Sequence, residues 1–245
     1  MAPFGLSALR SLLGRGVGNT PWQPPEASWS RRFGLGWESP YTVRYASNLD
    51  DGPDHGMPLG GFGAGCLGRS PSGAFNLWNL DGGEHWFGSI PDCQFALWEQ
   101  QGEDVRAHAL ATAPDRDDTD PSGGTPLSAW QWYPASTQGR STGTYAARYP
   151  LSWTHHEDVY RAGVLCEAFS PILPGDYQRT SYPVAVFRWQ FSNPTDQPLE
   201  LSLMLCWRNT VGWFTNTDAA AEVHFRDDGS PEHNYAPAIG RGEGQ

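Results

Sequence analysis

The sequence predicts an all-β protein built as an antiparallel β-sandwich, and three observations lead to this fold class. The 245 residues include 29 Gly and 21 Pro, which suit many turns between short strands. Aromatic residues make up 13% of the chain, so a sizeable core can form. After about residue 20, no long stretch keeps the apolar period of a helix.

The strongest local signal is a predicted hairpin between residues 183 and 209. Every second residue is apolar from Ala185 to Phe191, and again from Leu199 to Trp207. This alternation places one face of each strand in a core. The turn-forming residues 193–198 separate the two runs, so the strands are expected to pair antiparallel.

Other segments are assigned from their residue types. Residues 41–45, 143–153 and 164–172 are rich in β-branched and aromatic side chains, which predicts further strands. Residues 111–126 are polar, acidic and rich in turn formers, which predicts a surface loop.

The predicted organisation is a lead-in followed by one domain. Residues 1–40 are expected to form the lead-in, with a short amphipathic helix near its start, and residues 41–245 the sandwich. The last residues, 219–245, pass through turn formers without a closing strand. Because a sandwich normally ends with a strand paired in a sheet, the domain is predicted to be incomplete and truncated at its C-terminal end.

The composition excludes several classes of function. A net charge of −11 and a pI near 4.9 disfavour binding to nucleic acid or anionic lipid. All 16 basic residues are Arg, so the chain has no Walker A lysine and no Schiff-base lysine. The longest apolar runs fall far short of the ~20 residues that a transmembrane helix needs. No cofactor is expected.

The cysteine pattern and the N-terminus bear on the compartment. No C-x-x-C motif occurs, which favours buried, reduced thiols, with two disulfides as the alternative, at Cys66, Cys93, Cys166 and Cys206. The apolar stretch from Phe4 to Leu13 is interrupted by Arg10 and leads to no cleavage site, so no secretory signal is expected. The predicted localisation is cytoplasmic.

Residues 63–68 match the G-x-G-x-x-G pattern of dinucleotide-binding loops. That function needs a buried strand before the glycines and a helix after them, and neither flank is suited to form one. The pattern instead predicts a structural glycine loop, where missing Cβ atoms let another segment or a sugar come close. A positive φ or a close backbone contact is expected for at least one of Gly60, Gly61, Gly63 and Gly65.

Residues 81–86 bring two carboxylates, an imidazole and an indole together. Paired carboxyls beside aromatic surfaces are typical of glycoside chemistry. Asp-Gly-Gly is also a common tight turn, which is the leading interpretation, and no catalytic residue is assigned. The candidates for the rim of a sugar pocket are Trp78, Asp81, Glu84, His85 and Trp86.

His155 and His156 precede Glu157 and Asp158, a composition that suggests a metal site. Adjacent side chains of a strand point to opposite faces, so the two imidazoles could not bind one ion. We therefore predict a polar loop between strands and no metal.

A series of motifs follows in fixed order between roughly residues 40 and 215. The motifs read Met57-Pro-Leu-Gly-Gly-Phe-Gly-Ala-Gly, Leu67-Gly-Arg, Gly73-Ala-Phe-Asn, Asp92-Cys-Gln-Phe, Tyr149-Pro-Leu-Ser-Trp, Phe169-Ser-Pro-Ile-Leu-Pro-Gly-Asp-Tyr, Tyr182-Pro-Val-Ala-Val-Phe and Leu201-Ser-Leu-Met-Leu-Cys-Trp-Arg-Asn. This ordered series resembles the N-terminal domain of glycoside hydrolase family 116, the family of the non-lysosomal glucosylceramidase and of bacterial β-glucosidases.

The resemblance implies a β-sandwich followed by an (α/α)6 barrel that holds a Glu nucleophile and an Asp acid/base. Both would follow residue 245, so this chain by itself is expected to be inactive. The implied partner is that barrel, as a missing domain or a separate subunit, and the implied substrate is a β-glucoside or a glucosylceramide-like lipid. The alternatives are a truncated, non-functional fragment and a free-standing carbohydrate-binding module that uses exposed indoles such as Trp78, Trp86 or Trp132.

Overall fold

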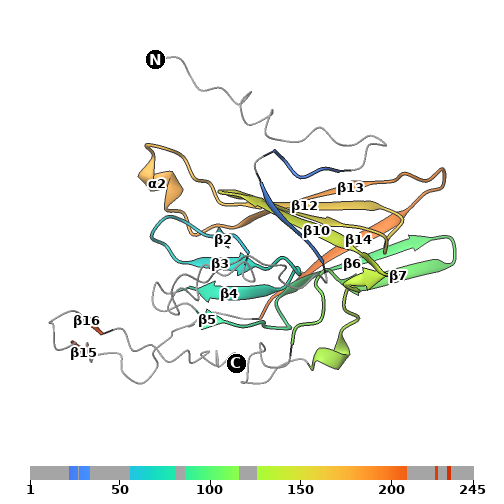
Figure 1. Ribbon diagram of the computed structural model, residues 1–245, viewed down its shortest axis with the longest axis horizontal. Helices are drawn as coiled ribbons and strands as arrows, with labels where there is room; N and C mark the ends of the chain where they lie inside the picture. The colour runs from blue at the N-terminus through green and yellow to red at the C-terminus, as the bar shows by residue number, and fades with distance from the viewer. Residues whose placement is uncertain are drawn as a thin grey trace, which may run out of the picture.

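The computed structural model describes residues 22–26, 28–33, 56–80, 86–115, 126–208, 224–225 and 231–232. These residues form two facing layers of antiparallel strands (Figure 1). Helix within them is limited to α2 (Tyr177–Thr180) and the 3-10 turn Leu127–Ala129. The predicted all-β, antiparallel fold is confirmed.

The first layer is a five-stranded sheet in which every neighbouring pair is antiparallel. In spatial order its strands are β1 (Trp29–Arg32), β10 (Gly143–Arg148), β11 (Leu151–His156), β12 (Gly163–Phe169) and β13 (Val186–Ser192).

The second layer combines a four-stranded and a three-stranded sheet. The larger sheet contains β2 (Pro58–Leu59), β3 (Cys66–Arg69), β4 (Phe75–Asn79) and β5 (Trp86–Phe87). The smaller sheet contains, in order, β14 (Glu200–Cys206), β6 (Gln94–Gln101) and β7 (Asp104–Ala109). Two pairs of two-residue strands complete the described strands: β8 (Ser136–Thr137) with β9 (Arg140–Ser141), and β15 (His224–Phe225) with β16 (Pro231–Glu232).

Aromatic rings join the two layers. The ring of Phe95 on β6 lies 5.2 Å from that of Phe187 and 5.0 Å from that of Trp189, both on β13. Phe75 on β4 meets Phe187 edge-on at 5.6 Å. Such edge-to-face pairs add about 0.5–1.5 kcal/mol each to the free energy gained by burial. This cluster is therefore the contact that closes the sandwich.

One charged side chain lies within this core. Arg69, which is 4% exposed, donates to the carbonyl oxygens of Gly73 and Leu110 at 2.9 Å and to Thr154 Oγ1 at 3.1 Å. Its guanidinium carbon lies over the rings of Phe95 and Trp189, 5.8 and 5.5 Å from their centroids. These contacts compensate the loss of hydration, which lowers the pKa of Arg69 from its ordinary value.

The strands predicted between residues 183 and 209 are present as β13 and β14, but their predicted pairing is wrong. β13 pairs with β12, whereas β14 pairs with β6 in the opposite layer. Residues 193–199 thus form an arch between layers, not a hairpin turn. Alternation shows which face of a strand is buried but not its partner, and these residues easily span the ~10 Å between packed sheets.

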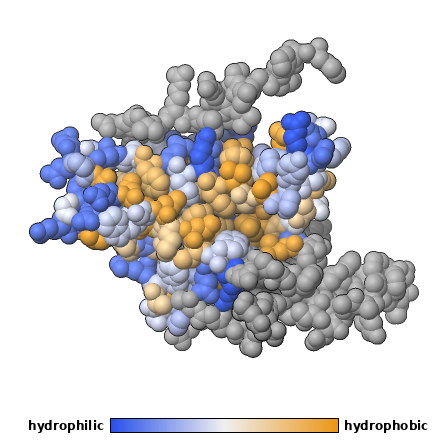
Figure 2. Space-filling model, turned by 180° about the vertical axis from the view of Figure 1, so that it is seen from behind, coloured by the Kyte–Doolittle hydropathy of each residue, from blue (hydrophilic) through white to orange (hydrophobic). Residues whose placement is uncertain are grey.

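The apolar row predicted on β14 is less buried than its alternation suggests. Leu203, Leu205 and Trp207 are 38–51% exposed, and Met204 on the other face is 48% exposed. β14 lies at the end of its three-stranded sheet and pairs only with β6 among the described strands, so its side chains have neighbours on one side. The opposite view of the molecule shows a band of apolar side chains across its middle (Figure 2).

The structure also bears on the other predicted segments. β1 lies within the residues assigned to the lead-in and pairs with β10, so part of residues 1–40 belongs to the sandwich. The predicted strand 143–153 is two strands, β10 and β11, joined by a turn at residues 149–150. The expected N-terminal helix, the strand at 41–45 and most of the loop at 111–126 lie outside the described residues.

All four cysteines are free, as predicted. Cys93 and Cys166 are buried, and desolvation raises their pKa to about 11 and about 12 respectively. Thiols with such pKa values remain protonated at neutral pH and react slowly. Cys93 and Cys166 are therefore packing residues of the core.

Candidate functional site

The glycine loop between β2 and β3 is fixed by a distant segment of the chain. The amide of Gly60 donates to Ser170 Oγ at 2.7 Å, and the amide of Phe62 donates to the carbonyl of Thr180 at 2.8 Å. A Cβ on Gly61 would overlap the carbonyl oxygen of Tyr182. The loop therefore needs glycine to reach residues 170–182.

Two loop glycines also adopt the left-handed conformation. Gly63 has φ +73° and Gly65 has φ +79°, and a Cβ on Gly65 would overlap the backbone oxygen of Asn79. Glycine reaches this region without the steric cost that other residues meet. The predicted positive φ and the predicted close backbone contact are both confirmed.

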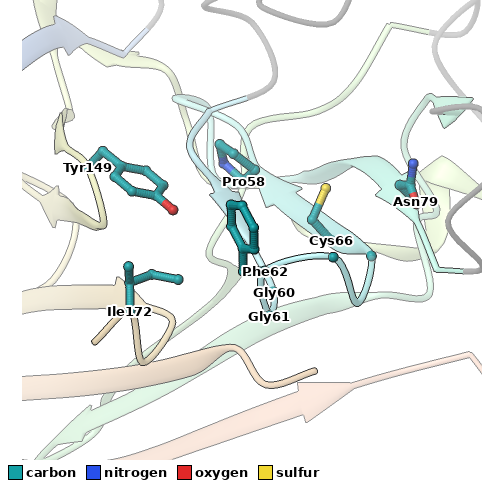
Figure 3. A pocket seen from close by; sticks show the side chains of 10 residues that line it. Pro58, Gly60, Gly61, Phe62, Cys66, Asn79, Tyr149 and Ile172 are labelled. Atoms are coloured by element: carbon teal, nitrogen blue, oxygen red, sulfur yellow. The ribbon is translucent and has the colours of Figure 1, made fainter. Parts of the chain in front are cut away.

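The loop forms one wall of a surface cavity of about 360 Å³. Phe62 and Tyr149 border it and are 65% and 62% exposed (Figure 3). None of the described residues that line it carries a charge: they are Pro58, Gly60, Gly61, Phe62, Gly63, Gly65, Cys66, Asn79, Tyr149 and Ile172. This glycine-loop cavity has the size of a small-molecule site and offers backbone groups, an amide and two rings.

Sequence reasoning identified the glycines of this cavity but missed Tyr149 and Ile172. The turn between β10 and β11 carries Tyr149, and Ile172 follows β12, so both residues are far from the glycines in sequence. Tyr149 does begin one of the motifs that carry the family resemblance. No local pattern indicates that its ring lies beside Phe62.

The residues proposed for the rim of a sugar pocket lie elsewhere. Trp78 is 1% exposed and donates its indole N–H to the carbonyl of Gly88 at 2.8 Å. Trp86 is half-buried on β5, 6.4 Å from Trp78 between ring centroids. Asp81, Glu84 and His85 lie outside the described residues.

The indoles named for a carbohydrate-binding module are poor stacking platforms in this fold. Stacking on a sugar needs an exposed ring face, and the core covers both faces of Trp78, which is a correction to that hypothesis. Trp132 is half-buried and donates to the carbonyl of Leu127 at 2.8 Å. The rings that stand exposed beside a cavity are those of Phe62 and Tyr149.

A second cavity of about 430 Å³ lies at the end of β11, and residues 155–158, the His-His-Glu-Asp segment, are among those that line it. His155 and His156 belong to the strand, which corrects the prediction of a loop at these two positions. They point to opposite faces, as predicted: His156 is 3% exposed and packs on Phe33, whereas His155 packs on Trp22. Burial holds the pKa of His156 well below its ordinary value.

Both carboxylates of this second cavity are ion-paired, Asp158 with Arg140 at 3.5 Å and Glu157 with two cationic partners. Glu157 Oε2 lies 3.0 Å from Arg32, and its other oxygen lies 3.3 Å from His155 Nδ1. The hydrogen bond from His155, followed by the charge of Arg32, holds the pKa of Glu157 below its ordinary value. A general acid of glycoside cleavage needs a raised pKa, so Glu157 is an ion-pairing residue.

Two buried carboxylates serve the fold. Glu99, which is 0% exposed, accepts from the amides of Arg161 and Ala162 at 2.9 and 2.8 Å. Glu167 contacts Arg188 at 2.5 Å and accepts from the Trp153 indole at 3.2 Å, and burial raises its pKa. Neither residue lines one of the two cavities, so both carboxylates act as internal anchors.

No group of three or more His, Cys, Asp or Glu side chains gathers into a metal site in the described part of the chain. Nor does any described helix have the length and apolarity to cross a membrane.

A comparison with known families identifies the domain. A family model described as beta-glucosidase 2, glycosyl-hydrolase family 116 N-term, matches residues 56–244. The match covers most of the chain and includes the glycine loop, every strand of the two layers except β1, and the cavity bordered by Phe62 and Tyr149. The chain therefore belongs to glycoside hydrolase family 116 and carries the N-terminal domain of that family.

Proposed function

We propose that this chain is the non-catalytic β-sandwich part of a β-glucosidase-like or glucosylceramidase-like glycoside hydrolase. The family match over residues 56–244 carries this proposal. In this view a helical-barrel catalytic domain, covalently linked or separate, supplies both catalytic carboxyls and binds the β-glucoside. The sandwich supports that domain.

The chemistry of the described cavities supports a non-catalytic role. A retaining glycosidase needs two carboxyl groups about 5–5.5 Å apart, one of them with a raised pKa. The glycine-loop cavity has no carboxyl among its described lining residues. The second cavity has two carboxyls, and both are paired with arginines: Glu157, whose pKa is lowered, with Arg32, and Asp158 with Arg140 at 3.5 Å.

The thiols support a localisation for this function. All four cysteines are free, and those at positions 93 and 166 are buried. Free thiols are typical of reducing compartments, so we propose that the domain works in the cytoplasm.

A reconstitution experiment tests the supporting role. Chain 1–245 is mixed with the separately expressed helical catalytic part of a family member, and hydrolysis of an aryl β-glucoside is followed as the chain is titrated. We expect saturable stimulation, because a supporting domain acts through a complex of fixed stoichiometry. A catalytic part that is equally active and equally stable at every concentration of the chain would contradict the supporting role.

A further inference from the structure

Two exposed aromatic rings border the glycine-loop cavity. Phe62 is 65% exposed and Tyr149 is 62% exposed, whereas the rings of Phe75, Phe95 and Tyr145 are at most 6% exposed. In Figure 3 the ring of Tyr149 points towards Phe62 and Pro58 at the edge of the cavity. Two aromatic faces are thus held in contact with water at a concave site.

These rings stand on a fixed backbone. The amide of Phe62 is bonded to Thr180, and the amide of Ala64 donates to the carbonyl of Gly61 at 3.0 Å. Tyr149 occupies the tight turn at which Arg148 on β10 pairs with Leu151 on β11. A pair of rings on a preformed frame binds a ligand without a large ordering cost.

The chemistry of the lining selects a neutral, polar ligand with an apolar face. No described lining residue is charged, so the cavity has no side chain that could form an ion pair with a phosphate, a carboxylate or an ammonium group. The polar groups that line it are the backbone of the glycine loop, the hydroxyl of Tyr149 and the side chain of Asn79. A Cβ on Gly63 would meet no atom within 4 Å, so the backbone there is open to a ligand.

We propose that this cavity binds one pyranosyl ring of a neutral saccharide or glycoside. One face of the sugar ring packs on Phe62 and the other on Tyr149, and its hydroxyls bond to the backbone of the glycine loop. The choice of a sugar among neutral ligands rests on the proposed function. The cavity volume of about 360 Å³ lies near the lower end of small-molecule sites, which fits a single ring better than a long chain.

Saccharide titration of chain 1–245 tests this site, with methyl β-D-glucopyranoside as the probe and NMR saturation transfer as the readout. We expect saturable, millimolar binding that weakens roughly tenfold in Phe62→Ala and in Tyr149→Ala, since each variant removes one stacking face. The matched control is Tyr177→Ala: Tyr177 is 76% exposed but does not line the cavity. Sorbitol, an open-chain polyol without a rigid C–H face, serves as the ligand control.

The outcomes separate this proposal from the supporting role. Loss of binding in both cavity variants, with Tyr177→Ala unchanged and all melting temperatures alike, supports the site. Absence of saturable binding, equal binding of sorbitol, or binding that either of the two truncations leaves unchanged would overturn it. The supporting role is tested by the hydrolysis and reconstitution assays, and none of these binding measurements bears on it.

Discussion

Replacing Arg69 with alanine is expected to lower the free energy of unfolding by about 3–5 kcal/mol. The change removes three hydrogen bonds and leaves the carbonyl groups of Gly73 and Leu110 without this donor in the core. It also leaves a cavity over the rings of Phe95 and Trp189, where the guanidinium lies in the wild type. In the wild type, the hydrogen bonds and ring contacts of Arg69 offset the cost of desolvating its charge. We therefore expect the loss of these contacts to outweigh the relief from removing the charge.

Equilibrium unfolding in urea, followed by tryptophan fluorescence, measures this effect. Arg148→Ala is the control: that arginine is exposed, and a surface substitution of this kind usually changes stability by about 0.5 kcal/mol or less. Arg69→Met should lie between wild type and Arg69→Ala, because methionine fills the space but bonds to none of the acceptors. If Arg69→Ala and Arg148→Ala unfold at the same urea concentration, the core role of Arg69 is wrong.

Gly65→Ala is expected to destabilise the domain by more than about 3 kcal/mol, through two additive causes. A φ of +79° costs an L-residue roughly 1–2 kcal/mol. The added Cβ would also overlap the backbone oxygen of Asn79, which flexible side-chain motion cannot relieve. Because Cys66 pairs with Asn79 in the β3–β4 ladder, relief requires the two strands to move apart.

Gly63→Ala is the matched comparison for this prediction. Gly63 has a similar φ of +73°, but a Cβ there meets nothing within 4 Å. Gly63→Ala should therefore show only the conformational cost, about 1–2 kcal/mol. The difference between the two variants measures the backbone overlap, and equal losses of stability would refute this explanation of Gly65.

The fold class was predictable because it depends on local patterns, whereas the pairing of strands was not. Alternation from Ala185 to Phe191 and from Leu199 to Trp207 correctly predicted β13 and β14. Their partners, β12 and β6, are set by contacts such as Phe95 with Phe187, which residues far apart in sequence make. A turn-forming segment can equally well reverse a strand within a sheet or cross between sheets.

The site was predictable only in part, for the same reason. A dense run of glycines indicates an unusual backbone, and Gly63 and Gly65 have one. Trp78 was proposed for the rim of a sugar pocket because indoles stack on sugars. Its side chain instead points from β4 into the core. The exposed ring of Tyr149 lines the cavity because Tyr149 lies in the turn between β10 and β11. A single strand was predicted over residues 143–153, and this turn was therefore not predicted.

The hydrolytic activity of purified chain 1–245 tests the central claim most directly. The substrate is an aryl β-glucoside, and the rate is compared with a buffer blank and with Asp81→Asn and Glu84→Gln. We predict no turnover above the blank in any of the three proteins, since the glycine-loop cavity has no described carboxyl and the two carboxyls of the second cavity, Glu157 and Asp158, are paired with arginines. Turnover by the wild-type chain that either substitution abolishes would contradict the non-catalytic role and place the reaction at residues 81–84.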